Sequence, residues 1–170
     1  MNKLKIVSYQ SEHLIELLSL LTEVRGTYPV YPPPASAGNT AESFREWLQN
    51  EEGVVRKVAL SDEKVVGHGM LSKPHDYIVD CLEVNGINFA PGVLVEIGKL
   101  FVSPSISHSG TGTALIKELV QFATENQMVP ISCILEDSPE SLALHRKLGF
   151  EIIASFDGIS GVNHLLTYSR

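Results

Sequence analysis

The feature that most constrains the fold is a long apolar segment that leads through a glycine-containing loop into an amphipathic helix. Residues 93–102 read VLVEIGKLFV, which is apolar enough to predict a central strand. Residues 110–126 repeat apolar side chains at helical spacing. The face that they predict for the core comprises Leu115, Leu119, Phe122 and Ala123. A strand, a short loop and a helix in this order are typical of sheets that are covered by helices.

The rest of the chain also mixes strands with helices. Further strands are predicted at 4–8, 54–60, 64–71, 130–135, 151–156 and 163–168, and further helices at 11–25, 40–50 and from Pro139. Residues 76–84 fit a short helix or, through Asn85-Gly86, a hairpin, and the helix is favoured. The prolines within 28–38 predict a loop, because they lack the N–H that a helix or central strand needs.

These elements predict an α/β fold, in which a mixed sheet of about seven strands is flanked by about four to five helices on its two faces. A chain of 170 residues suits a single domain over 1–170.

The composition excludes several classes of function. A net charge of −7 argues against nonspecific nucleic-acid binding, so any anion site must be local. Cys81 and Cys133 form no metal-binding motif, and free buried thiols in a reducing compartment are expected rather than a disulfide. No apolar run is long enough to span a bilayer, and the first residues lack the core of a signal peptide. The expected location is therefore the cytoplasm, without membrane partners.

The loop before the helix at 110–126 is the clearest candidate binding site. Gly110-Thr111-Gly112 opens that helix, and a helix N-terminus presents free N–H groups and a positive dipole end to a phosphate. The chain has no GxxxxGK[ST] segment, and Leu115 stands where a dinucleotide fingerprint needs a third glycine. A glycine helix start without any ligand is the alternative at this point.

Two motifs together resemble the GNAT superfamily of N-acetyltransferases. The first is Leu100-Phe101-Val102-Ser103-Pro104 followed by Ser107-His108-Ser109-Gly110-Thr111-Gly112, similar to the family's L-x-V-x-P and Q/R-x-x-G-x-G/A. The second is Leu144-His145-Arg146-Lys147-Leu148-Gly149-Phe150, similar to L-Y-x-K-L-G-F. The resemblance implies a GNAT-like fold with splayed central strands, and acetyl-CoA as cosubstrate without a metal.

The resemblance also implies which residues hold coenzyme A. The strand residues Leu100, Phe101 and Val102 would bind the pantetheine arm through their backbone, like an added strand. Ser138 would either bond the pantetheine or only cap its helix. The pyrophosphate would lie on the amides of His108, Ser109, Gly110, Thr111, Gly112 and Thr113.

Two positions depart from the family pattern. Ser107 replaces the leading Arg or Gln, which removes one contact to the pyrophosphate that His108 or Lys117 could partly replace. His145 replaces the usual tyrosine, as in phosphinothricin-type acetyltransferases.

Acetyl transfer by direct attack in a ternary complex needs a base for the amine and an acid for the departing thiolate. Glu96 lies in the central strand, where alternation predicts one face for Glu96, Gly98, Leu100 and Val102, and it is the candidate base. The alternative for Glu96 is a carboxylate satisfied by a neighbouring side chain or water. His145 is the candidate acid, because an ordinary histidine can give or take a proton near neutral pH, and the alternative is a packed, hydrogen-bonded histidine.

The amine acceptor, a small molecule or a peptide, is not identified by the sequence. Tyr28 and Tyr31 of the proline-rich loop could line its site, and His68 and His75 could do the same or take surface or core roles. A homodimer is an open alternative to a monomer. Two other functions compete: an inactive CoA-binding sensor or interaction domain, and a nucleotide-binding protein that uses the GTG loop.

Overall fold

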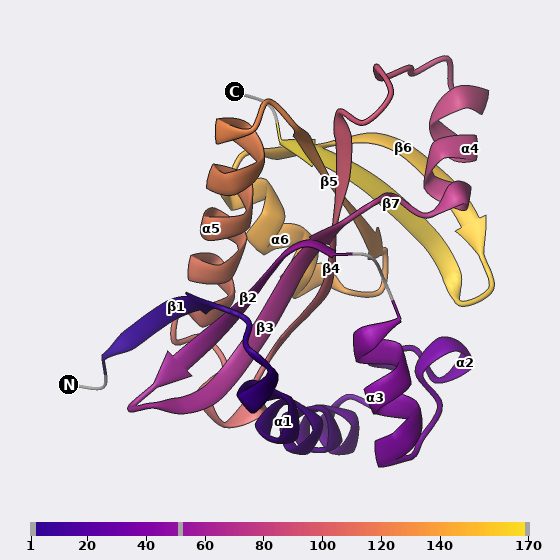
Figure 1. Cartoon of the computed structure of the whole chain (residues 1–170). Coiled ribbons are helices and arrows are strands. Elements are labelled where there is room, and N and C mark those ends of the chain that lie inside the picture. Colours follow the sequence, from indigo (N-terminus) through magenta and orange to yellow (C-terminus); the bar gives the residue numbers. More distant parts are fainter. Residues whose placement is uncertain (1–2, 51–52, 169–170) are drawn as a thin grey trace. The chain divides into compact units, whose positions relative to one another are not determined.

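The computed structural model describes residues 3–50 and 53–168, which form a mixed sheet and its helices (Figure 1). The strand order is β1-β2-β3-β4-β5-β7-β6. The strands are β1 (Leu4–Ser8), β2 (Gly53–Ser61), β3 (Lys64–Ser72), β4 (Leu94–Val102), β5 (Val129–Leu135), β6 (Phe150–Gly158) and β7 (Gly161–Tyr168). The α-helices are α1 (Leu14–Thr27), α2 (Pro34–Ala37), α3 (Ala41–Gln49), α4 (Asp76–Val84), α5 (Thr111–Glu125) and α6 (Pro139–Lys147), and the 3-10 helices are η1 (Ser11–His13) and η2 (Pro104–Ile106).

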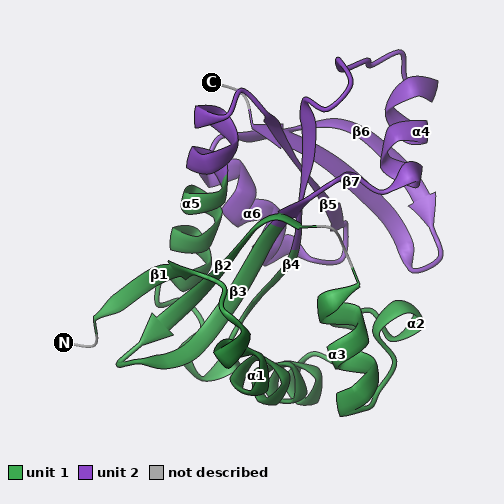
Figure 2. Ribbon diagram, in the orientation of Figure 1, with its two compact units in different colours: residues 1–70, 99–119 green, residues 71–98, 120–170 purple. Residues whose placement is uncertain are grey.

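The chain divides into two compact units (Figure 2). Unit 1 comprises residues 1–70 and 99–119, and unit 2 comprises residues 71–98 and 120–170. The boundaries fall inside β3, β4 and α5, so each of these elements contributes residues to both units. A single domain over the whole chain stays a prediction.

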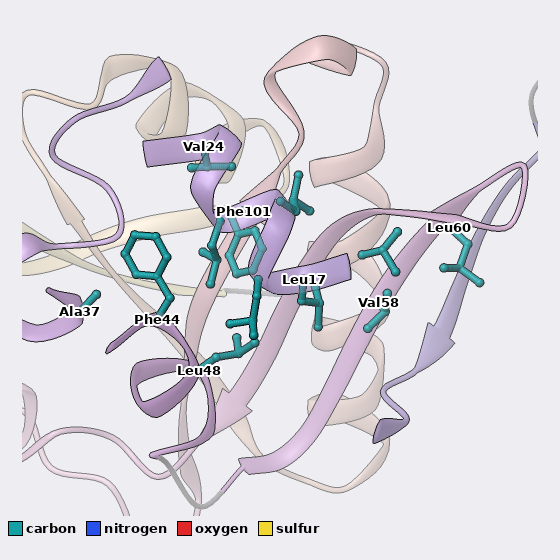
Figure 3. Close-up of a cluster of buried hydrophobic side chains, with 12 residues drawn as sticks. Leu17, Val24, Ala37, Phe44, Leu48, Val58, Leu60 and Phe101 are labelled. Carbon is teal, nitrogen blue, oxygen red and sulfur yellow. The ribbon is translucent and has the colours of Figure 1, made fainter. Parts of the chain in front are cut away.

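Unit 1 is built around one cluster of buried apolar side chains (Figure 3). β1 pairs antiparallel with β2, from Leu4↔Ser61 to Ser8↔Lys57. Burial of each leucine or phenylalanine in such a cluster contributes about 1.5–3 kcal/mol, which offsets the entropy lost on ordering the chain. The cluster includes Leu17, Leu21 and Val24 of α1, Phe44 and Leu48 of α3, Val58 and Leu60 of β2, and Phe101 of β4.

Unit 2 joins antiparallel and parallel pairing. β7 pairs antiparallel with both β5 and β6. β4 pairs parallel with β5, from Leu94↔Val129 to Glu96↔Ile131. Among the described residues of unit 2, Glu96 is the last residue of β4 in this register. The strands themselves continue, β4 to Gly98 within this unit and β5 to Leu135. One buried apolar cluster of unit 2 comprises Ile78, Leu82, Ile131, Ala154 and Leu165.

The order of strands and helices predicted from the sequence is confirmed, and so is the preference for a helix over a hairpin at 76–84. That helix, α4, ends at Val84, and Gly86 follows with a φ of +71°, a left-handed conformation that glycine adopts at little cost. Cys81 and Cys133 are free thiols, as predicted, but both are partly exposed rather than fully buried.

The prediction that 28–38 contains no helix was wrong. Pro34 begins the short helix α2. The first turn of a helix does not use its N–H groups in the helical ladder, so a proline there removes nothing. Counting α2, the described residues form six α-helices rather than the four to five predicted.

Arg25 holds the proline-rich loop to α1. Its guanidinium donates hydrogen bonds to the carbonyls of Tyr31, Pro32 and Gly38 and to the side chain of Asn39. The guanidinium carbon also lies 5.2 Å from the centre of the Phe44 ring. Only the branched donor group of arginine can reach so many acceptors at once.

We therefore expect Arg25→Lys to lower the free energy of unfolding by about 1–3 kcal/mol, because several carbonyls lose their donor although the charge is kept. Urea unfolding would measure this change. Arg45 is exposed on α3, and Arg45→Lys should change the free energy by less than about 0.5 kcal/mol. Equal effects of the two substitutions would show that the loop does not depend on the guanidinium.

Candidate active site

The segment that joins β4 to α5 in unit 1 is fixed by short polar contacts. Ser103 Oγ accepts the N–H of Ser105 at 3.3 Å and donates to Glu23 Oε1 of α1 at 2.8 Å. Ser103 is buried, so these bonds satisfy a hydroxyl that would otherwise be costly to bury. They define where the chain leaves the sheet.

The loop then turns sharply into α5. His108 and Gly110 have φ angles of +66° and +87°, so both are left-handed. The helical ladder starts with the N–H of Ala114, which donates to the carbonyl of Gly110 at 2.9 Å. The amides of residues 111–113 therefore have no acceptor within the ladder and form the positive end of the helix.

Most of this loop is accessible. Residues 107–110 are exposed, whereas Thr111 is buried and shares a hydrogen bond of 2.8 Å with Ser109 through their hydroxyls. A Cβ on Gly110 would meet no atom within 4 Å, so space remains beside the backbone at that residue. The residues predicted to bind a diphosphate thus lie on the loop and the first turn of α5 in unit 1, which offer it amides and hydroxyls.

Lys99 interrupts β4 with a φ of +47°. This left-handed conformation costs a non-glycine residue about 1–3 kcal/mol and needs support from its surroundings. Lys99 has that support within unit 1: its carbonyl accepts a hydrogen bond of 2.8 Å from His68 Nδ1, and its Nζ donates to the carbonyl of Trp47. The Nζ also lies 5.2 Å from the centre of the Trp47 ring.

His68 is completely buried and stacks on Phe101, with 5.2 Å between ring centres. Burial lowers the pKa of His68 to about 4, so the ring is neutral at pH 7. Because Nδ1 donates to Lys99, the Nε2 atom carries a lone pair, and it has no hydrogen-bond partner among the described residues. These contacts favour a role for His68 in positioning β4, and its predicted role in binding the acceptor stays a prediction.

The left-handed Lys99 also interrupts the regular alternation of side chains along β4. Strand alternation assigned Glu96 and Leu100 to the same face, but alternation holds only along a regular strand. The shared face predicted for Glu96 therefore does not extend to residues beyond Lys99.

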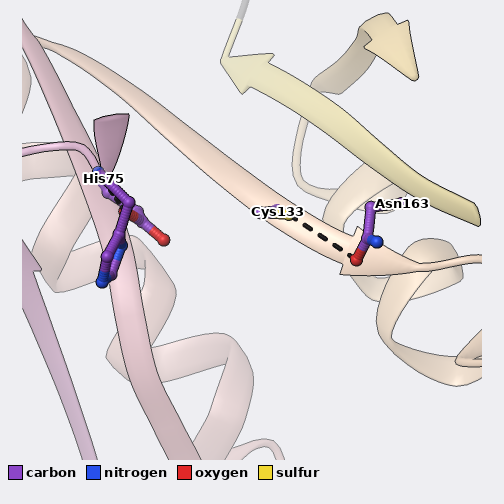
Figure 4. Close-up of polar contacts among 4 residues, drawn as sticks. His75, Cys133 and Asn163 are labelled. Atoms are coloured by element: carbon purple, nitrogen blue, oxygen red, sulfur yellow. Dashed lines mark hydrogen bonds and ion pairs between the residues drawn. The ribbon is translucent and has the colours of Figure 1, made fainter. Parts of the chain in front are cut away.

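Glu96 lies in the part of β4 that belongs to unit 2, and it is buried. Its Oε2 atom accepts two hydrogen bonds from His75, one from the backbone N–H at 3.1 Å and one from Nδ1 of the ring at 2.7 Å. Figure 4 shows His75, whose ring also stacks on Tyr77 with 5.3 Å between ring centres. The sequence identified both Glu96 and His75 as candidates, but it gave no signal that they form a pair.

Cys133 of β5 lies close enough to Glu96 in unit 2 to be affected by its charge. The Sγ of Cys133 lies 3.8 Å from Asn163 Oδ1 (Figure 4). The side chain of Tyr77 also hydrogen-bonds with this thiol. Burial, together with the charge of Glu96, raises the pKa of Cys133 to about 12. Cys133 is therefore a neutral thiol and not a nucleophile at physiological pH.

His145 of α6 is buried against the edge of the Phe150 ring. Its Nδ1 bonds the carbonyl of Ser141 at 2.9 Å, and its Nε2 has no hydrogen-bond partner in the described part of the chain. Burial lowers the pKa of His145, so a neutral ring presents a lone pair at Nε2. This geometry favours the packed, hydrogen-bonded alternative over the role of an acid.

The remaining candidate residues are Ser138, which was predicted to bind pantetheine, and Tyr28 and Tyr31, which were predicted to line the acceptor site. Ser138 occupies the N-cap position of α6, but its side chain makes no capping hydrogen bond. Tyr31 packs edge-on against Trp47, with 6.2 Å between ring centres, and Tyr28 is exposed. Their predicted roles toward pantetheine and acceptor stay predictions.

Two further absences hold for residues 3–50 and 53–168. No group of three or more histidine, cysteine or acidic side chains is placed to hold a metal ion. None of the helices has the length and apolar character that crossing a bilayer requires.

The burial of His68 predicts how stability depends on pH. Between pH 6.5 and about 4 the unfolded chain binds a proton at this residue and the folded chain does not, so the free energy of unfolding falls as the pH is lowered. The loss should approach about 3 kcal/mol at pH 4, and His145 adds to it in the same direction. Urea unfolding from pH 7 to 4 should show a shallower loss for His68→Gln than for the parent chain. The same slope in both proteins would contradict a neutral buried imidazole.

Known structures of the same architecture include several acetyltransferases. AAC(6')-Ib in complex with ribostamycin and coenzyme A matches with a TM-score of 0.74 and 15 % identity, over 99 % of this chain and 94 % of that one. The PaiA N-acetyltransferase from Thermoplasma acidophilum, in complex with coenzyme A, has a TM-score of 0.68 at 14 % identity, over 99 % of both chains. A ribosomal-protein-alanine N-acetyltransferase from Brucella melitensis has a TM-score of 0.68 at 22 % identity, over 96 % of this chain and 97 % of that one.

At these identities the likeness shows the fold, and among curated proteins no significant match exists. The family is shown by the sequence itself. Residues 17–150 match the model of the acetyltransferase (GNAT) family, and this match covers most of the chain and includes the glycine loop. The chain belongs to the GNAT family of acetyltransferases.

Proposed function

We propose that this protein transfers an acetyl group from acetyl-CoA to an amine by direct attack in a ternary complex. The observation that carries the proposal is the start of α5, where a member of an acetyltransferase family places the amides of residues 111–113 outside the helical ladder, directly after an exposed, glycine-containing loop. Such an N-terminus binds phosphate through several N–H donors and through the helix dipole together.

In this proposal the diphosphate of coenzyme A binds the amides of His108 and of residues 110–113, because the amide of Ser109 already donates to the carbonyl of Ile106 at 3.2 Å. The left-handed His108 and Gly110 turn the backbone at this loop, and Gly110 leaves room for an oxygen beside the chain. Ser107 contributes no charge, so the binding energy comes mainly from main-chain donors and hydroxyls. This is consistent with a protein of net charge −7, in which no general cationic field attracts an anion.

The pantetheine arm binds along Leu100, Phe101 and Val102 through backbone hydrogen bonds, in the manner of an added strand. Support comes from the match of Leu100-Phe101-Val102 to the strand motif of the GNAT family, whose model residues 17–150 match.

The reaction forms the C–N bond of an amide and breaks the C–S bond of the thioester. The amine nitrogen attacks the thioester carbonyl carbon, a main-chain N–H near Leu100 stabilises the oxyanion, and the thiolate of coenzyme A departs. The acceptor is a small-molecule or peptide amine. It must lose a proton, and Glu96 is the carboxylate proposed to support that loss.

One observation favours a second candidate, a CoA-binding domain without catalysis. His145 stands where the family has its tyrosine, and the environment of His145 disfavours the charged ring that would act as an acid. In that case the protein binds coenzyme A without turnover.

Gly112→Asp should abolish binding of coenzyme A, because it adds bulk and a negative charge among the amides that face the diphosphate. Isothermal titration calorimetry with coenzyme A would measure the loss, which we expect to exceed about 100-fold in affinity. Gln127→Asp adds the same charge beyond the far end of α5 and should leave the affinity within a few-fold. Unchanged binding by Gly112→Asp would show that the phosphates bind elsewhere.

A further inference from the structure

The hydrogen bonds of Glu96 define where the proton of the His75 ring lies. A backbone N–H can only donate, so Oε2 of Glu96 is an acceptor at 3.1 Å from the nitrogen of His75. The same oxygen lies 2.7 Å from Nδ1 of the ring, a distance typical of a charge-assisted bond. Nδ1 therefore carries the hydrogen, and a neutral His75 has its lone pair on Nε2.

The two partners differ in their access to a substrate. The side chain of Glu96 is 8 % exposed and that of His75 is 44 % exposed. The carboxylate is therefore largely withdrawn from solvent, whereas the imidazole is accessible from it. The Tyr77 ring, nearly parallel to that of His75 at 20°, restricts the orientation of the imidazole.

We propose that His75 is the catalytic base of this enzyme and that Glu96 is a positioning residue that acts through it. Nε2 of His75 takes the proton from the attacking amine, either directly or through one water. Glu96 keeps the ring in the productive tautomer and stabilises the imidazolium that forms. The imidazolium returns the proton to solvent after the amide has formed and the thiolate has left, so no additional reactant is needed. This inference rests on the proposed acetyl transfer and goes beyond it by assigning the proton acceptor.

The surroundings of the dyad are compatible with this role. The titratable groups around the dyad include Glu96 of β4, Tyr77 and Asp76 of α4, Cys81 of α4 and Cys133 of β5. Of these, Glu96 is the buried carboxylate in contact with the ring, and the thiol of Cys133 stays neutral. A negative charge at Nδ1 favours proton uptake at Nε2.

A structural alternative exists, because His75 is also the N-cap residue of α4. In that case Glu96 only anchors the start of the helix through the backbone N–H of His75. The alternative predicts that substitutions of the ring affect stability and not the dependence of turnover on pH. The experiment must therefore distinguish proton transfer by the His75 ring from anchoring of α4 through the His75 backbone N–H.

The test compares the parent enzyme with His75→Ala, His75→Gln and Glu96→Gln. Turnover of acetyl-CoA would be followed by thiol release, with spermidine, ribostamycin and an alanine-initiated peptide as acceptors and with water alone.

We expect His75→Ala and His75→Gln to lower kcat by about 10²–10⁴-fold with KM for acetyl-CoA within a few-fold, because they remove the base and leave the donor site intact. The loss of kcat that protonation of the base causes on the acid side of the parent's pH profile should be absent from both variants. Added imidazole should restore part of the turnover of His75→Ala and none of that of Glu96→Gln, whose ring is present but no longer held.

His164→Ala is the matched control. His164 also belongs to unit 2 and has a carboxylate nearby, Glu136 at 3.8 Å, so this variant should keep the parent kcat. Thermal unfolding would confirm that each variant is folded, and His75→Gln keeps the backbone N–H that Glu96 accepts.

Parent-like kcat in folded His75→Ala or His75→Gln would overturn the inference while leaving the transferase assignment intact. The same holds if Glu96→Gln loses turnover and the His75 variants do not, because Glu96 would then act directly. Binding of coenzyme A by the parent chain without thiol release under any of these conditions would overturn both the inference and the proposed transferase.

Discussion

The chain must leave β4 and enter α5 within eight residues while the first amides of the helix stay outside the helical ladder. Ser103 begins the turn through its bond to Glu23, and His108 and Gly110 complete it in left-handed conformations. If these amides were instead satisfied by a capping side chain, an anion would gain little from the helix terminus. The backbone conformation of this loop is thus the reason for proposing an acetyl donor that carries phosphate groups, which is acetyl-CoA.

Two buried histidines and one exposed histidine illustrate how the partner at one ring nitrogen determines the chemistry of the other nitrogen. His68 and His145 bond backbone carbonyls and are held neutral by burial, so they suit positioning and packing. His75 bonds a carboxylate and keeps an accessible ring, which is the arrangement needed to take up a proton. The residue type alone would not have separated these roles.

The sequence predicted the order of elements and the glycine loop well, because apolar periodicity and glycine positions are local signals. It did not predict the left-handed Lys99, since lysine gives no indication of a positive φ. It did not pair His75 with Glu96 either, because the two are 21 residues apart and their contact depends on the tertiary path of the chain before α4. The helix at Pro34 was missed because a general rule about proline was applied without its exception for the first turn.

The central claim is that main-chain amides at the start of α5 bind the diphosphate of coenzyme A. A calorimetric titration of the protein with coenzyme A and, separately, with pantetheine tests it, because pantetheine has the same thiol arm without the diphosphate. The account predicts that coenzyme A binds at least about 100-fold more tightly, since several charge-assisted hydrogen bonds are lost with the phosphates. Equal affinities, or no binding of coenzyme A at millimolar concentration, would contradict it.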